Sequence, residues 1–318
     1  DGVEFDEDRS FSSQNDNQDN NPTRDIPETL NIQNNYFENN ASGDGENFYS
    51  HGYEGTIDVS NSIFENIDCE TNSVNEFVLR SIENEADYVQ NEISGNCIES
   101  SSFYVSADGS DDGQGTQSDP LHTIGHALTL VRDGETVTTI NLASGTYSPT
   151  TTGENFPIVL PDKVHLIGDG SETTILDAEA DAESEAAVMI IKEVENVRVA
   201  NLTLTGGYSE GHGCTGGGGL LLTADDMFNF GDDIPGDPSV PSNPLIENVI
   251  IEDNHSHNGG GLSFFRMSGP VLNNVIIRNN TATAFGGGVF SYCSTTDMTD
   301  VTITENQNQG NGQGGGIM

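Results

Sequence analysis

The chain has 318 residues and a formal charge of −43, because 52 Asp and Glu residues face only 9 Lys and Arg residues. A charge of this size repels nucleic acid and anionic membrane surfaces, which excludes both as partners. No run of apolar residues is long enough to span a membrane as a helix. Three conditions would accommodate the charge: a salty medium around a solvated acidic surface, bound divalent cations, or cationic partners.

Residues 1–102 contain a first set of short apolar runs. A polar and acidic loop at residues 6–27 interrupts them. The related segments NNYFEN and NSIFEN follow, and their equivalent residues Asn34 and Asn61 are 27 positions apart. Both ends of the chain resemble parts of such a repeat. We therefore expect a piece of a longer protein, or a mature unit whose ends dock on other copies.

Two cysteines of this region have the spacing of the repeat. Cys69 and Cys97 are 28 positions apart, so they are expected to stack on neighbouring repeats. Two alternatives remain open, a disulfide bond or two buried thiols in an apolar stack. Cys214 and Cys293 have no evident partners, and no cysteine spacing suits zinc.

Residues 103–133 break the pattern with a strand at 103–106 and a loop rich in Gly and Asp. A helix is expected next, because four apolar residues share one helical face: Leu121, Ile124, Leu128 and Val131. Asp119 is expected to cap this helix, with Pro120 at its first position.

Strands resume at Thr138 and end in the clearest repeats of the chain. Asn254, Asn280 and Asn306 are each 26 positions apart, and a Gly triplet follows each of them. Self-similarity at a fixed period, with apolar runs of only a few residues, predicts a β-solenoid with one coil per repeat. The three asparagines are expected to stack as a structural ladder of hydrogen bonds. An insertion at residues 223–244 interrupts the coils.

These motifs resemble those of known families. The run YVSADGSDDGQGTQSDPLHTIGHAL resembles the start of many pectate-lyase-like proteins of the right-handed parallel β-helix superfamily, where a helix caps the solenoid. The FxxN motif at Phe37–Asn40, with the Gly-plus-apolar runs, is similar to repeats of polymorphic outer-membrane autotransporter proteins. The resemblance implies an all-β fold of two stacked right-handed parallel β-helix modules with a short capping helix at their junction.

The expected domains follow from this resemblance. Residues 1–102 are the last coils of a first module. Residues 103–133 are an opening strand, an acidic loop and the capping helix. Residues 134–318 are a second module that carries the insertion.

The acidic loop is the strongest candidate for a metal site. Asp108, Ser110, Asp111 and Asp112 crowd a tight Gly-rich turn, and such oxygen ligands suit Ca²⁺. A solvated acidic turn is the alternative. A second candidate lies in the insertion, at Asp225, Asp226, Asp232 and Asp233.

No catalytic residue is assigned. The resemblance to pectate-lyase-like enzymes implies a Lys or Arg base, but the nine basic residues are scattered along the chain. Related hydrolases use paired Asp residues near a Gly-His-Gly motif, which occurs here at Gly211–Gly213 without the accompanying elements. A turn residue in a Gly-rich loop is the simpler interpretation of His212.

Two classes of function remain. The first is a secreted or cell-surface structural and adhesive β-helix that assembles end to end into an extracellular filament, with Ca²⁺ stabilising its acidic loops. Its partners are further copies of itself, other cell-surface components or extracellular polysaccharide. The alternative is a carbohydrate-active enzyme, a polysaccharide lyase or hydrolase, or a glycan-binding module without catalytic activity.

Overall fold

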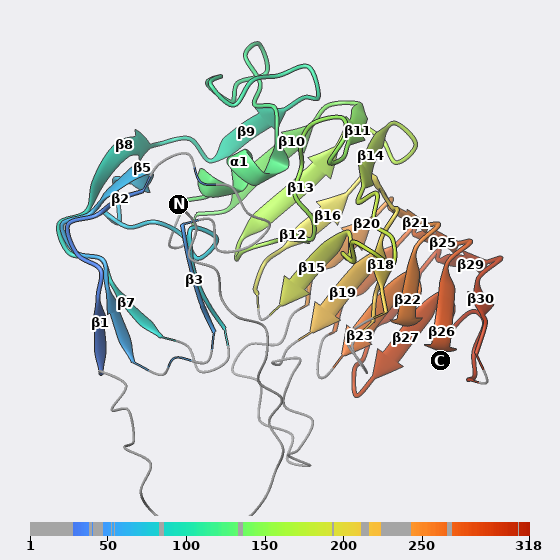
Figure 1. Ribbon diagram of the computed structural model, residues 1–318. Helices are drawn as coiled ribbons and strands as arrows, with labels where there is room; N and C mark the ends of the chain where they lie inside the picture. Colours follow the sequence, from blue (N-terminus) through green and yellow to red (C-terminus); the bar gives the residue numbers. More distant parts are fainter. Residues whose placement is uncertain are drawn as a thin grey trace, which may run out of the picture.

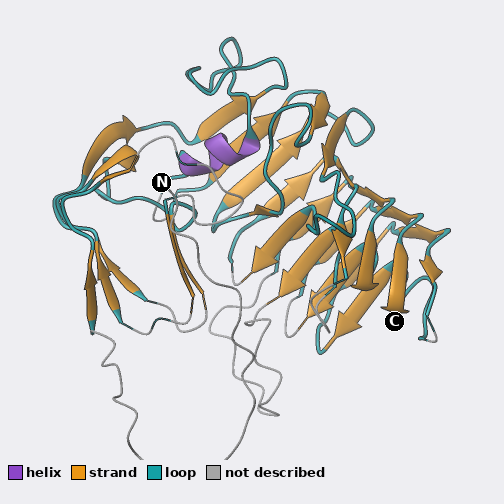
Figure 2. Ribbon diagram, viewed as in Figure 1, coloured by secondary structure: helices purple, strands orange, loops and turns teal. Residues whose placement is uncertain are grey.

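The protein is a parallel β-helix, as predicted. The structure, a computed structural model, describes residues 28–37, 40, 47–51, 53, 55–82, 86–132, 136–192, 194–210, 216–223, 243–265, 269–310 and 312–318. All pairings between its named strands are parallel. Figures 1 and 2 show two groups of coils made of short strands, with the helix α1 (Ile124–Thr129) where the groups meet. The predicted loop at 6–27 and residues 224–242 of the insertion lie outside the described residues.

The first group of coils contains three small sheets. They are β1 (Thr29–Asn31), β4 (Thr56–Asp58) and β7 (Asp87–Val89); β2 (Tyr36–Phe37), β5 (Ile63–Asp68) and β8 (Ser94–Ile98); and β3 (Phe48–His51) with β6 (Leu79–Ile82). Asn34 and Asn61 hold equivalent left-handed turns, with φ of 60° and 58°. Short polar side chains adopt this conformation more readily than others, which explains their recurrence in the two segments.

The second group contains four sheets. The first is β9 (Ser102–Val105), β10 (Thr138–Leu142), β13 (Val164–Gly168), β16 (Arg198–Ala200), β20 (Leu245–Glu247), β24 (Val271–Asn273) and β28 (Asp297–Thr299). The second is β11 (Gly145–Tyr147), β14 (Thr174–Asp177), β17 (Thr203–Thr205), β21 (Ile250–Glu252), β25 (Ile276–Arg278) and β29 (Thr302–Thr304). The third is β12 (Ile158–Val159), β15 (Met189–Lys192), β19 (Leu220–Thr223), β23 (Leu262–Phe265) and β27 (Val289–Tyr292). The fourth is β18 (Tyr208–Ser209), β22 (His255–Asn258), β26 (Thr281–Phe285) and β30 (Gln307–Asn308).

The core consists of columns of apolar side chains that run through successive coils. Strand register aligns one such column through the first sheet: Phe103, Ile140, Leu166, Val199, Ile246, Leu272 and Met298. Alternate residues of each strand point inward, so every coil contributes one member to each column. The apolar runs of the sequence are short because each crosses only one wall of a coil.

The helix begins later than predicted. Its N-cap is Thr123, whose hydroxyl accepts a hydrogen bond from the His126 amide, and not Asp119. Leu121 instead exchanges backbone hydrogen bonds with Tyr104 and Ser106, next to β9. This pairing keeps the chain extended through Leu121. The carboxylate of Asp119 accepts a hydrogen bond from the Gln114 amide within the preceding loop.

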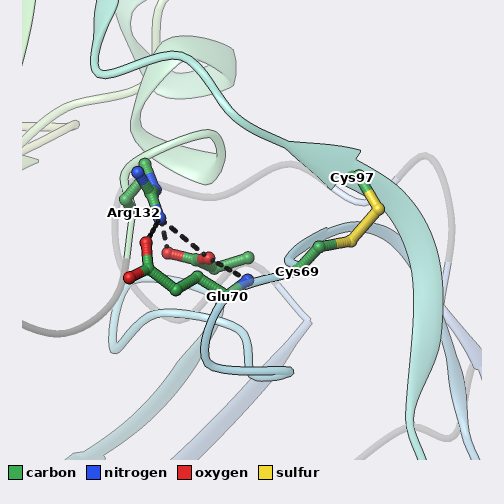
Figure 3. The surroundings of a disulfide bond; sticks show 5 residues. Cys69, Glu70, Cys97 and Arg132 are labelled. Atoms are coloured by element: carbon green, nitrogen blue, oxygen red, sulfur yellow. Dashed lines mark hydrogen bonds and ion pairs between the residues drawn. A yellow bond between two sulfur atoms is a disulfide. The ribbon is translucent and has the colours of Figure 1, made fainter.

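A polar contact joins the first group of coils to the end of the helix. The buried Asn75 side chain donates to the carbonyl oxygens of Leu128 and Val131, at 3.2 and 2.7 Å, where the helix leaves carbonyl groups without intrahelical partners. Arg132 follows the helix and donates to both carboxylate oxygens of Asp68, at 3.1 and 3.3 Å. Arg132 also pairs with Glu70 (Figure 3). The division into modules at residues 102 and 133 stays a prediction.

The structure decides between the two alternatives for the cysteine pair. Cys69 and Cys97 form a disulfide bond that joins the turn after β5 to β8 (Figure 3). Cys69 stands between Asp68 and Glu70, so the same turn carries both the disulfide and the carboxylates that hold Arg132. Cys293 is an exposed free cysteine, and Cys214 lies outside the described residues.

The asparagines of the three clearest repeats form a continuous ladder. The Asn280 side-chain oxygen accepts from the Asn254 backbone amide at 3.1 Å, and the Asn306 oxygen accepts from the Asn280 amide at 2.9 Å. The Asn280 amide group also donates to the Ile251 carbonyl at 2.9 Å. Asn254 and Asn280 are 1% and 0% exposed, so these bonds satisfy turn groups that water does not reach.

The ladder predicts a strong dependence of stability on Asn280. Replacing it in an Asn280→Ala variant leaves several buried backbone groups without partners, each of which costs about 1–3 kcal/mol. We expect the free energy of unfolding to fall by about 3 kcal/mol, measured by urea denaturation. Asn306→Ala is the matched control, because Asn306 is only partly buried at the end of the ladder, and its loss is expected to be smaller. Equal losses would contradict the role of burial.

Candidate functional site

The acidic loop is bound to the start of the helix. The Asp111 carboxylate accepts hydrogen bonds from the backbone amides of His122 and Thr123, at 2.8 and 2.9 Å, and from the Thr123 hydroxyl at 2.9 Å. Asp108, Ser110 and Asp112 are exposed. Within the described residues, no group of three or more His, Cys, Asp or Glu side chains is arranged to hold a metal ion. The structure therefore ties Asp111 to Thr123, the N-cap of the helix, and Ca²⁺ binding by this loop stays a prediction.

A second carboxylate at the same helix end was not predicted. Glu154, which is 3% exposed, accepts hydrogen bonds from the amides of Ile124 and Gly125 at 2.7 and 2.8 Å. Burial raises the pKa of Glu154 to about 7, although the two amide hydrogen bonds oppose this shift. No local motif marks Glu154, because it lies about one coil after the helix that it contacts.

A set of hydrogen-bonded polar side chains lies along the fourth sheet. We call it the Glu210 cluster: Tyr208, Glu210, His255, His257 and Thr283. Strand register places Tyr208 beside His255, and His255 beside Thr281 on the next coil. Side chains at alternate positions of these strands point away from the core. The coils thus hold the cluster on a regular backbone scaffold.

Glu210 is the centre of this cluster. Its Oε1 lies 2.8 Å from Nε2 of His255, and its Oε2 lies 3.7 Å from Nδ1 of His257. The Thr283 hydroxyl lies 2.9 Å from each carboxylate oxygen and 3.1 Å from Nδ1 of His257. The rings of Tyr208 and His255 stack with centroids 4.5 Å apart. The side chains of Glu210 and His255 remain 25% and 26% exposed, and that of His257 40%.

This arrangement suits hydrogen bonding to an external ligand. A carboxylate, two imidazoles and a hydroxyl converge where solvent still reaches them. The repeats contain a signal for the cluster that was missed. The first and third residues after each ladder asparagine are both polar: His255 and His257, Thr281 and Thr283, Gln307 and Gln309. Aligning the repeats on the ladder would have placed them on one outer wall.

Other predicted residues cannot be placed. Gly211–Gly213 and the four Asp residues of the insertion (Asp225, Asp226, Asp232 and Asp233) lie outside the described residues. The four arginines within the described residues pair with carboxylates: Arg80 with Glu76, Arg132 with Asp68 and Glu70, Arg198 with Glu247, and Arg278 with Glu252. These ion pairs are the arrangement expected for structural cations.

Comparison with known proteins assigns a family without a known activity. The family described as "Protein of unknown function (DUF1565)" matches residues 107–318. The chain belongs to this family. No curated protein matches the sequence. A solved structure of pectin methylesterase from carrot is 15% identical, with a TM-score of 0.32, over 62% of this chain and 63% of the carrot chain. The match spans less than two thirds of the carrot protein, and at this TM-score it carries no argument about activity.

Glu154 predicts a dependence of stability on pH. Its pKa is about 7 in the folded protein and ordinarily 4.5, so folding takes up a proton between these values. The stability that depends on protonated Glu154 is therefore fully present below about pH 4.5 and is lost as the pH rises through 7. We expect the wild type to lose about 3 kcal/mol between pH 4.5 and pH 8, measured by urea denaturation. The Glu154→Gln variant cannot ionise at this position, so its stability is expected to fall less over the same pH range. This difference separates the effect of Glu154 from general charge repulsion. An equal loss of stability in both proteins would contradict the assignment.

Proposed function

We propose that this protein is a secreted or cell-surface structural and adhesive β-helix that binds extracellular polysaccharide on its outer wall. The Glu210 cluster is the observation that carries the proposal. It presents partly exposed hydrogen-bonding groups on a regular face, and polysaccharides offer hydroxyl groups at regular intervals. Strands in a sheet lie about 4.8 Å apart, so polar groups recur along the face at a fixed spacing.

Two further features support a place outside the cell. The disulfide between Cys69 and Cys97 is of a kind that persists in oxidising compartments and is rare in the cytosol. The charge of −43 suits a solvated surface in a salty medium. No helix in the described part of the chain is long and apolar enough to cross a membrane.

End-to-end assembly is a second role that a specific observation favours. Strands β28, β29 and β30 are edge strands of three sheets. The core residues Met298, Val301 and Ile303 of this coil are only partly buried. Edge strands template the pairing of a further strand, which a following coil or a second copy would supply together with apolar cover.

A binding role is favoured over a lyase by the arginines. All four arginines in the described part of the chain pair with carboxylates, whereas a lyase of uronate polymers needs a free basic group beside its substrate. A hydrolase that uses the Gly211–Gly213 motif remains the alternative to a binding protein.

The proposal predicts binding without cleavage. In native gels that contain soluble polysaccharides, we expect at least one to retard the protein without release of reducing ends. The His255→Ala/His257→Ala variant is expected to lose the retardation. Thr302→Ala/Thr304→Ala is the matched control, because it alters exposed residues on β29, in another sheet of the same stack. Retardation by none of the polysaccharides, or cleavage of the one that binds, would contradict the proposal.

Assembly has its own test. In negative-stain electron microscopy of the purified protein we expect filaments, and we expect a calcium chelator to dissolve them if Ca²⁺ holds the acidic loops. Filaments that survive chelation would separate assembly from Ca²⁺. Discrete particles with and without the chelator would contradict end-to-end assembly but leave polysaccharide binding intact.

A further inference from the structure

We infer that the Glu210 cluster selects a glycan that carries protonated amino groups, such as a polymer of glucosamine. The inference rests on the proposed function, because it names the substrate class of the same outer wall. It follows from the acceptors that converge at Glu210, from the carboxylates that surround them, and from the regular polar face that continues beyond them.

The geometry at Glu210 matches an ammonium group. Such a group has three N–H donors and no acceptor. The Glu210 side chain is 25% exposed, and its carboxylate oxygens accept from the Thr283 hydroxyl, whose own oxygen lies 2.9 Å from each of them. An ammonium group that reaches this point meets three oxygen atoms from two coils. Hydrogen bonds between charged partners are about twice as strong as neutral ones, so an amine binds here better than a sugar hydroxyl group.

The surroundings add negative charge. The Glu210 backbone amide donates to the carboxylate of Glu185 at 3.0 Å. The exposed turn that precedes Glu185 carries Asp181 and Glu183. Burial, and then the charges of Glu210 and these three carboxylates, raise the pKa of Tyr208. Within the described part of the chain, Glu210 pairs with His255 and His257.

This charge pattern separates classes of glycan. A polymer of uronic acids brings its own carboxylates and is repelled by Glu210 and its neighbours. A neutral glycan is neither attracted nor repelled. A polymer of amino sugars is attracted, and its charge complements that of the protein.

The shape of the wall favours an extended polymer over a folded protein. Beyond His255 and His257, the same positions on the next coils are Thr281 and Thr283, then Gln307 and Gln309. Hydroxyl and amide groups thus continue along the stack at the strand spacing of about 4.8 Å. A chain of sugars can lie along such a row and use each group in turn. A lysine from a protein partner would use only the cluster itself.

Isothermal titration calorimetry with short oligomers tests the inference in physiological salt, where binding by diffuse charge is weak. We expect the glucosamine oligomer to bind, and the N-acetylated and galacturonate oligomers to bind at least about tenfold more weakly. Glu210→Gln is expected to weaken glucosamine binding about tenfold. Asp297→Asn removes the same charge from an exposed position on β28, and it is expected to change binding less than about twofold.

Several results would overturn the inference. Equal binding of the glucosamine and N-acetylated oligomers would remove the role of the amino group, and equal losses in the two variants would reduce the binding to diffuse charge. An oligolysine peptide that binds as tightly, with the same dependence on Glu210, would replace the glycan with a protein. Binding of a neutral or uronate oligomer that depends on His255 and His257 would overturn the selection of amino groups but retain the proposed function. Binding of no oligomer at all would count against both the inference and the proposed function.

A measurement on the unaltered protein guards against variants that do not fold. In the wild type, the ring proton resonances of His255 and His257 are expected to shift together during titration with the glucosamine oligomer. The ring of His122, a residue that precedes the helix and whose backbone amide donates to Asp111, serves as the internal reference. Shifts of equal size at all three rings would overturn the assignment of the site.

Discussion

Hydrogen bonding between one coil and the next is the interaction on which this structure depends. A single coil has no partner for its strand edges and cannot bury its own apolar side chains. Parallel pairing to the neighbouring coil solves both problems, and the column from Phe103 to Leu272 is its result. At the corners, where the strands stop, Asn254 and Asn280 continue the same contact through their side chains. The outer wall inherits this regularity, which is why Glu210 and its neighbours have fixed relative positions.

The features that could be predicted from the sequence are those that repeat in register. The spacing of Asn254, Asn280 and Asn306 reflects the length of a coil, and the short apolar runs reflect its walls. The Gly triplets also have a direct cause. A Cβ atom at Gly260 would lie 2.4 Å from the Thr281 carbonyl oxygen, and one at Gly287 would lie 2.4 Å from that of Gln307. Neighbouring coils approach too closely there for any side chain, so glycine recurs with the period of the coil.

The features that could not be predicted depend on contacts outside this period. Asp119 has the local pattern of a helix cap, but pairing of Leu121 with β9 overrides it. Glu154 contacts the helix only because the intervening residues form most of a coil and return the chain to the helix. Glu210 and His255 lie on neighbouring coils, yet the insertion at 223–244 places them 45 positions apart in the chain. A search for residues one repeat length apart in the sequence therefore does not find this contact. An alignment of the repeats on the ladder asparagines does.

The ladder also has an evolutionary consequence. The Asn254 and Asn280 side chains each bond to the coil before them and to the coil after them, so a coil is chemically interchangeable with its neighbour. A duplication or deletion of a complete repeat leaves no hydrogen-bonding group unmatched, whereas a one-residue insertion within a strand turns core side chains outward. We expect members of this family to differ in length by whole coils of about 26 residues, with all other length variation in the loops. Gene length in such a lineage changes by multiples of one repeat, and the length of the outer wall that binds the ligand changes with it.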